Sequence, residues 1–192
     1  ASGGPFLRTP AHELKNVTVA EAVNHPRWKM GRKITVDSST LMNKGFEVIE
    51  ACWLFGVDIS QVTVVIHPQS VIHSMVAFRD GAVIGQMSLP DMRLPIQYAL
   101  TYPERLHLDI PRLDFYKLGG FTFSEPDMDK FPCLRIALEA MRRGGNIPCA
   151  MNAANEVAVA AFLDERIRFT DIPAIVSRSI DKCSFIKEPD LN

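Results

Sequence analysis

The sequence predicts an α/β (α+β) protein, with a mixed-sheet catalytic domain followed by a helical C-terminal domain. Two observations carry this prediction. Short β-branched or alternating apolar runs gather in the first half of the chain, at residues 34–36, 62–66 and 71–89. From residue 133 onward, apolar residues instead recur with the spacing of helices. With 47% hydrophobic residues in a chain of 192, there is enough apolar material for a packed core.

The domain boundaries follow from changes in this patterning. We expect residues 1–102 to form the catalytic domain, with a lid loop at residues 25–31. Residues 103–132 are rich in turns and proline, which is typical of a linker. Residues 133–192 are expected to form the helical domain, in truncated form. Because the chain opens on Ala1 rather than Met, we expect it to begin inside a longer protein.

Local signals set the expected elements of the first 60 residues. Thr18 and Glu21 have the spacing of a capping box, which predicts a short helix there. Residues 34–36 are predicted to be a strand. The oxygens that follow, from Asp37 onward, are predicted to cap a helix that runs to about Phe55 and ends at Gly56.

The rest of the chain is predicted to hold a hairpin and four helices. Residues 62–66 are expected to be a buried strand of the mixed sheet, which spans residues 34–90. Asp80-Gly81 separates two apolar runs and is a strong hairpin signal. The expected helices are residues 91–102, 133–142, 150–163 and 171–183.

Charge and cysteine content exclude several classes of protein. The 21 basic and 22 acidic residues nearly cancel, so we expect neither nucleic acid nor an anionic membrane as a partner. The four scattered cysteines are expected to be free thiols, as in bacterial cytoplasm or plastid stroma. No apolar run approaches the length of a membrane span.

The predicted helix after residue 37 holds the most informative cluster. At helical spacing, Asn43, Lys44 and Glu47 share one face, and Ser38 lies at the expected helix start, where free N–H groups attract phosphate. Glu47 also offers an oxygen ligand to Mg²⁺ or Mn²⁺. An ordinary solvated helix with an ion pair explains the same pattern, and one carboxylate is not a metal site.

Two further segments could border such a site. The loop from His25 to Gly31 carries Trp28 and is a candidate lid, although Trp28 could equally anchor the loop to the core. His67 and His73 are six residues apart, which is not the spacing of a helical zinc pair, so they are expected to brace a loop or border the site. The Ala-rich segment from Asn152 is interpreted as a structural helix.

Together these segments resemble the 1-deoxy-D-xylulose 5-phosphate reductoisomerase family. The resemblance rests on five motifs: Ser2-Gly-Gly-Pro-Phe6, His25-Pro-Arg-Trp28-Lys-Met-Gly-Arg-Lys33, Val36-Asp-Ser38-Ser-Thr-Leu-Met-Asn43-Lys44-Gly-Phe-Glu47, His67-Pro-Gln-Ser-Val-Ile-His73-Ser-Met75 and Met151-Asn-Ala-Ala-Asn-Glu156. It implies rearrangement of a ketose phosphate and its reduction by NADPH to 2-C-methyl-D-erythritol 4-phosphate, in non-mevalonate isoprenoid biosynthesis. It also implies a homodimer.

The resemblance assigns roles residue by residue. It implies that Ser2, Ser38, Asn43 and Lys44 bind the substrate, chiefly its phosphate, with His25 nearby. Glu47 would contact substrate and be one of three acidic ligands of Mg²⁺ or Mn²⁺, and Trp28 would belong to the lid; these two are the expected catalytic residues. Gly31 would touch the nicotinamide cofactor. The family's dinucleotide-binding domain and its other two metal ligands are not in this sequence, so the chain alone is expected to be inactive.

Two alternatives remain open from the residues themselves. One is a metal-dependent phosphosugar isomerase or aldolase without nicotinamide, which would lack a dinucleotide-binding fingerprint elsewhere in the protein. The other is a non-catalytic phosphate-binding or dimerisation module. In that case, Glu47→Gln would leave the function unchanged.

Overall fold

The computed structural model describes residues 1–26, 28 and 30–190. The chain forms two compact units. Unit 1 comprises Ala1–Ser2 and Ile66–Ser124, and unit 2 comprises Gly3–Val65 and Glu125–Asn192. The C-terminal helices thus belong to the same compact unit as most of the first 65 residues. The functional division at residues 102 and 133 stays a prediction.

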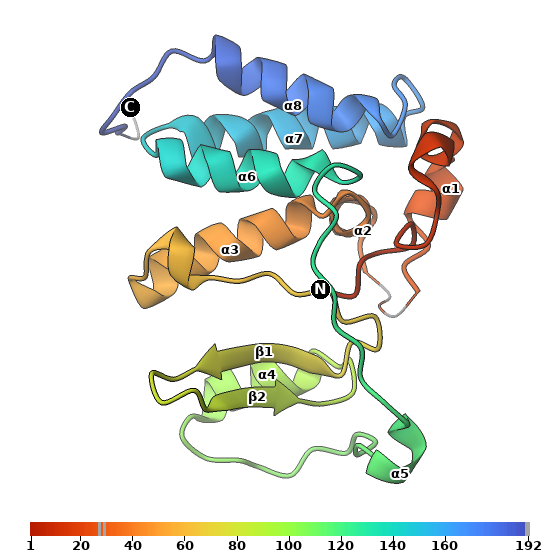
Figure 1. Ribbon diagram of the computed structural model, residues 1–192, viewed down its shortest axis with the longest axis vertical. Coiled ribbons are helices and arrows are strands. Elements are labelled where there is room, and N and C mark those ends of the chain that lie inside the picture. Colours follow the sequence, from red (N-terminus) through yellow and green to blue (C-terminus); the bar gives the residue numbers. More distant parts are fainter. Residues whose placement is uncertain (27, 29, 191–192) are drawn as a thin grey trace. The chain divides into compact units, whose positions relative to one another are not determined.

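Unit 2 is helical, and its helices enclose one apolar core. In Figure 1, α6, α7 and α8 run alongside one another, with α3 packed on α6. The elements are η1 (Ala11–Asn16), α1 (Val19–Ala22), α2 (Arg32–Thr40), α3 (Met42–Phe55), η2 (Ile59–Gln61), α6 (Pro132–Arg143), α7 (Ile147–Leu163) and α8 (Asp171–Lys182). The largest fully buried apolar side chains in this core include Met42, Leu134, Ile147, Met151 and Ile172.

Several elements form where local signals predict them. Thr18 and Glu21 make the expected capping box: the Thr18 N–H donates to Glu21 Oε2 at 2.7 Å, and the Glu21 N–H donates to Thr18 Oγ1 at 3.3 Å. Gly56 ends α3 in the left-handed conformation, with φ of 61°. The three C-terminal helices are also confirmed, within a few residues at each end.

The predicted strand at residues 34–36 is wrong, because these residues lie in α2. Thr35, Val36, Ser39 and Thr40 are all buried, and their spacing is that of one helix face. Ser39 Oγ lies 2.8 Å from the carbonyl oxygen of Ala22, which links α2 to α1. Packing of this face outweighs the strand preference of a three-residue run.

The predicted helix start near Asp37 is also wrong. Asp37 lies inside α2, and the chain breaks at Leu41, whose φ is 62°, before α3 begins at Met42. The Thr40 hydroxyl holds this break: it donates to the carbonyl of Asp37 at 3.2 Å and accepts from the Met42 N–H at 3.3 Å. Both Leu41 and Met42 are buried. We attribute the tolerance of a left-handed leucine to that burial, which offsets its steric cost.

Unit 1 contains the predicted hairpin and two helices. Strands β1 (Ile72–Ala77) and β2 (Val83–Met87) pair antiparallel, with Met75 opposite Gly85. At the turn, the Ala82 N–H donates to Asp80 Oδ1 at 2.9 Å. Helices α4 (Arg93–Thr101) and α5 (Phe115–Leu118) follow.

The expected mixed sheet is absent from the part of the chain that the structure describes. There the sheet consists of β1 and β2 alone and is antiparallel. Of residues 62–66, only Ile66 pairs, through an isolated antiparallel bridge to Ser124. No neighbouring strand in the described residues offers residues 62–65 a ladder, and β-branched residues without one do not form a strand. An α/β mix is thus correct, but its sheet is small.

No helix in the described residues has the length and apolar character that crossing a membrane requires. All four cysteines are free thiols, as predicted. Burial raises the pKa of the Cys133 thiol to about 12.

Candidate functional site

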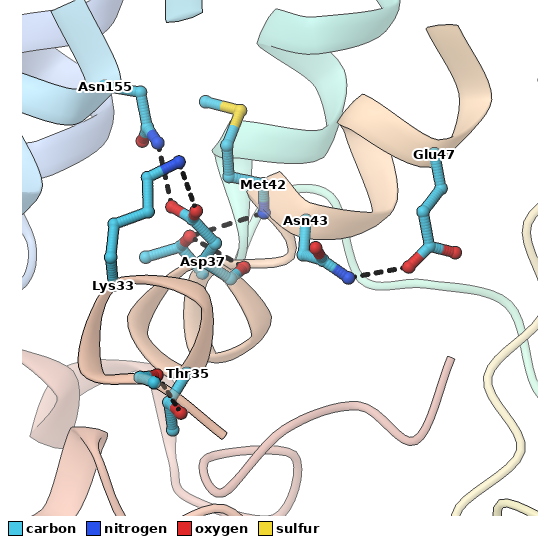
Figure 2. A network of polar contacts seen from close by, with 9 residues as sticks. Lys33, Thr35, Asp37, Met42, Asn43, Glu47 and Asn155 are labelled. Carbon is cyan, nitrogen blue, oxygen red and sulfur yellow. Dashed lines mark hydrogen bonds and ion pairs between the residues drawn. The ribbon is translucent and has the colours of Figure 1, made fainter. Parts of the chain in front are cut away.

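Three of the predicted site residues meet at the start of α3. Asn43 Nδ2 donates to Glu47 Oε1 at 2.6 Å, and the Lys44 ammonium pairs with Glu47 Oε2 (Figure 2 shows the Asn43 contact). The Lys44 side chain is 21% exposed and that of Glu47 is 45% exposed. An amide, an ammonium and a carboxylate therefore share one face, as their spacing predicts, and remain accessible to a ligand.

Gly45 allows α3, which carries this cluster, to pack closely against α6. It lies between the cluster residues in sequence, on the buried side of α3, where a Cβ atom would overlap the Cβ of Ala137 in α6. The absence of a side chain lets α3 approach α6 closely. The backbone that carries Asn43, Lys44 and Glu47 is thus fixed by helix packing rather than by a loop.

Ser38 lies in the last turn of α2 and is half-buried. Within the described residues its hydroxyl makes no hydrogen bond. The backbone of Gly4 packs against it: a Cβ at Gly4, whose φ is 68°, would lie 2.8 Å from the Ser38 carbonyl oxygen. Position 4 thus requires glycine. Ser2 is half-buried and belongs to unit 1, whereas the other predicted substrate ligands belong to unit 2.

The expected lid is described only in part, because Arg27 and Lys29 lie outside the described residues. The Trp28 N–H donates to His25 Nδ1 at 2.9 Å, so the ring accepts at Nδ1 and carries its proton on Nε2. Burial lowers the pKa of His25 from its ordinary 6.5, which favours this neutral form. Both side chains are half-buried.

Gly31 precedes α2 and is exposed. A Cβ added at Gly31 would meet no other atom within 4 Å. The backbone here is therefore open to close approach by a ligand.

An open hollow of about 400 Å³ lies beside Asn43. Its wall includes Lys33 and Asp37 from α2 and Met151 and Asn152 from α7. A second, mainly apolar cavity of about 220 Å³ is lined by Leu14, Phe131 and Phe169 among others, and by none of the predicted site residues. Of these two, the first hollow adjoins the α3 cluster.

The α3 cluster offers a metal ion one carboxylate ligand, that of Glu47. Within the described residues, no group of three or more His, Cys, Asp or Glu side chains is arranged to hold a metal. The Glu47 carboxylate alone fits Mg²⁺ or Mn²⁺ as a single ligand, since both ions prefer carboxylate oxygens.

His67 and His73 brace unit 1. His67 is buried, with Nδ1 3.1 Å from the Thr122 carbonyl and Nε2 accepting the Val71 N–H at 3.3 Å. His73 Nε2 lies 2.9 Å from the Ser70 carbonyl. Of the two roles expected for them, bracing a loop is the one the contacts support.

Sequence reasoning overlooked Asp37 and Asn155, which are 2% and 0% exposed. Asn155 Nδ2 donates to Asp37 Oδ1 at 2.8 Å, which joins α7 to α2. A signal was available: Asn155 shares the helical face of Met151, Ala158 and Phe162, which are all buried. An asparagine within such a face predicts a buried polar partner.

Comparison with known proteins places these features in one family. Residues 87–192, more than half of the chain, match the family described as "DXP reductoisomerase C-terminal domain". Residues 1–55 match "1-deoxy-D-xylulose 5-phosphate reductoisomerase C-terminal domain". The chain belongs to the 1-deoxy-D-xylulose 5-phosphate reductoisomerase family.

Relatives named 1-deoxy-D-xylulose 5-phosphate reductoisomerase agree with this assignment. Over 98% of this chain, the sequence is 58% identical to the relative from Lachnospira eligens. Over the whole of this chain, it is 54% identical to the relative from Acetivibrio thermocellus. In both cases it covers 50% of the relative. The chain therefore spans about half the length of the curated relatives that it matches.

Solved structures of this family share the fold. A crystal structure of DOX-P reductoisomerase in complex with NADPH, fosmidomycin and magnesium matches with a TM-score of 0.93 and 51% identity, over 95% of this chain and 45% of that one. The enzyme from Zymomonas mobilis in complex with NADPH matches with a TM-score of 0.91 and 46% identity, over 98% of this chain and 48% of that one.

Proposed function

We propose that this chain supplies the substrate-phosphate site and one metal ligand of a 1-deoxy-D-xylulose 5-phosphate reductoisomerase. The reaction is the NADPH-dependent rearrangement and reduction of that ketose phosphate to 2-C-methyl-D-erythritol 4-phosphate, a step of non-mevalonate isoprenoid biosynthesis. The convergence of Asn43, Lys44 and Glu47 at the start of α3 carries the proposal. Family membership and the NADPH and magnesium bound by similar structures support it.

The phosphate group is bound at the first turn of α3. Lys44 supplies a positive charge and Asn43 a neutral donor, beside a helix end whose free N–H groups favour an anion. Ser38 contributes its hydroxyl from the neighbouring turn, and His25 lies in the same unit. The family motif at the N-terminus adds Ser2 to this set. Holding the phosphate far from the reacting carbons orients the substrate and uses binding energy away from the chemistry.

Glu47, next to the phosphate ligands on α3, and the lid act on the rest of the substrate. Glu47 is one carboxylate ligand of Mg²⁺ or Mn²⁺, and the remaining ligands come from outside the described residues. When bound, the ion polarises the substrate carbonyl and NADPH delivers hydride. Trp28 covers the substrate and excludes water, and the open backbone at Gly31 receives the nicotinamide.

The active form is a homodimer that covers the hairpin of unit 1. The apolar side chains Val76, Val83 and Ile84 are 58%, 59% and 65% exposed. A two-stranded hairpin is only marginally stable by itself. We expect Ile84→Asp to yield monomers in analytical ultracentrifugation, whereas Val157→Asp, on the exposed side of α7, leaves the dimer intact. A dimer that survives Ile84→Asp contradicts this assignment.

The test uses a chimaera in which this chain replaces the matching half of the Acetivibrio thermocellus relative. We expect it to consume NADPH when 1-deoxy-D-xylulose 5-phosphate and Mg²⁺ are supplied. Glu47→Gln should lower kcat roughly a hundredfold or more, because a metal ligand is lost. Lys44→Ala should raise the KM for the ketose phosphate but not for NADPH. Lys182→Ala, at the exposed end of α8, should change neither.

Three outcomes contradict the proposal. The first is a folded chimaera that binds NADPH but does not consume it with this substrate. The second is turnover of the ketose phosphate without NADPH, which would favour an isomerase or aldolase. The third is full activity in Glu47→Gln, which would leave the chain a binding or dimerisation module.

The free cysteines fit a reducing compartment, and we assign the protein to the bacterial cytoplasm or the plastid stroma. The bacterial origin of the named relatives favours the first.

A further inference from the structure

Asp37 is a carboxylate enclosed by donors. It is 2% exposed, yet both of its oxygens are bound: Oδ1 accepts from Asn155 Nδ2 and Oδ2 from Lys33 Nζ, each at 2.8 Å (Figure 2). Lys33 belongs to the same helix as Asp37, whereas Asn155 belongs to α7, 118 residues further along the chain. The pair therefore ties α2 to the C-terminal helices through a directional contact.

Apolar side chains at positions 37 and 155 would cost less free energy to bury than this carboxylate and amide. Burying a carboxylate and an amide loses hydration, and well-packed apolar side chains of similar size usually stabilise a core at least as well. Asn155 is fully buried, and within the described residues its Oδ1 has no hydrogen-bond partner, which adds to that cost. What the pair supplies in return is geometry, because a charge-assisted hydrogen bond fixes distance and angle.

The same residue also supports the break between α2 and α3. The Asp37 carbonyl accepts from the Thr40 hydroxyl, and that hydroxyl accepts the N–H of Met42, the first residue of α3. Asp37 thus contacts α7 through its side chain, and its carbonyl is linked to the start of α3 through the Thr40 hydroxyl. Ser38 follows Asp37 directly in sequence, and Asn43 follows Met42. A rotation of α2 about its axis would therefore move Ser38 and the start of α3.

We infer that Asp37 and Asn155 are positioning residues, which set the orientation of the α2–α3 junction and thereby of Ser38, Asn43 and Lys44. Both residues are buried, so we assign neither of them a contact with the substrate. This inference rests on the proposed function, because it concerns the same phosphate site. The Ala-rich segment at residues 152–156 was expected from the sequence to be purely structural. Through Asn155 we now assign it a role in positioning the site.

The test exchanges the two side chains in the chimaera described above. Asn155→Asp places two carboxylates face to face in the interior, which disfavours the contact. We expect the KM for the ketose phosphate to rise roughly tenfold to a hundredfold, since small misplacement of binding groups has effects of that size. The KM for NADPH stays unchanged, and kcat falls less than the substrate KM rises.

Adding Asp37→Asn to Asn155→Asp restores every hydrogen bond of the pair. The amide introduced by Asp37→Asn can accept from Lys33 and donate to the new carboxylate on α7. We expect the KM of this double variant to return to within about threefold of the parent, if the two changes compensate as contacting residues do. Val157→Asp adds the same charge to the exposed side of α7 and should leave the KM unchanged.

Two results overturn the inference: Asn155→Asp folds with an unchanged KM, or the double variant folds without recovering its KM. If Asn155→Asp fails to fold, the double variant decides alone. An NMR measurement on the 192-residue chain separates this inference from the proposed function. The side-chain amide signals of Asn43 should shift in Asn155→Asp and return in the double variant, whether or not the chimaera turns over substrate; unshifted signals contradict positioning.

Discussion

Units 1 and 2 differ in where their apolar side chains lie. In unit 2 a set of large apolar residues is fully buried, including Ile172, Met151 and Leu134, although the end of α3 also exposes apolar side chains. In the hairpin of unit 1 they face solvent, as the exposed Ile84 illustrates. The α3 cluster belongs to the unit that stabilises itself, whereas the hairpin needs another surface to bury its side chains. Under the proposed function, unit 2 therefore sets the geometry of the α3 cluster and the hairpin of unit 1 supplies the dimer contact.

The largest expected effect is a loss of unfolding free energy, measured for an Ile→Ala truncation in each of the two units. Ile172→Ala empties a fully buried position and should cost about 2–5 kcal/mol of unfolding free energy. Ile84 is 65% exposed, so Ile84→Ala should lower the unfolding free energy by about 0.5 kcal/mol or less, at chain concentrations low enough to prevent dimerisation. Urea denaturation followed by circular dichroism measures both. Equal costs would mean that the hairpin is buried, and the contrast between the units would fail.

A second test asks how tightly unit 2 is packed beneath the site. Gly45→Ala places a methyl group against Ala137, and the strain should cost about 1–3 kcal/mol, beyond the gain in helix propensity. Gly120→Ala in unit 1 meets no atom within 4 Å and serves as the control. Denaturation midpoints report the difference. A neutral or stabilising Gly45→Ala would show that α3 can move away from α6 freely.

The smallest effect concerns the pH dependence of the loop that holds Trp28. Because burial lowers the pKa of His25 below 6.5, the folded loop binds a proton less readily than the unfolded chain. Its contribution to stability is complete above pH 6.5 and is lost as the pH falls through the lowered value. Protonation also removes the acceptor for the Trp28 N–H.

Trp28 fluorescence provides the measurement, in a Trp53→Phe background that removes the other tryptophan. The emission should change on acidification below pH 6.5, and His25→Asn should abolish this transition. A transition that persists unchanged in His25→Asn must arise from another group. The assignment to the loop would then be incorrect.

The helical spacing of Asn43, Lys44 and Glu47 was readable without coordinates, because i, i+3 and i+4 neighbours meet on any helix. The sequence did not show which helix carries these residues, or at which end of it they lie. The sequence pointed to a helix start at Ser38, and the chain instead breaks at Leu41, a residue with no local preference for a left-handed turn. Burial of Leu41 and the Thr40 hydrogen bonds decide that position, and neither follows from a local pattern.

By itself, the sequence determined the elements whose signals are local: the Thr18 capping box, the Gly56 helix end, the hairpin at Asp80-Gly81 and the amphipathic C-terminal helices. It also carried the motifs of the family. The tertiary structure alone decided that residues 34–36 are helical and that Asp37 meets Asn155. The physical reason is range: caps and turns are satisfied within a few residues, whereas a short β-branched run or a buried carboxylate takes the conformation and partner that distant packing provides.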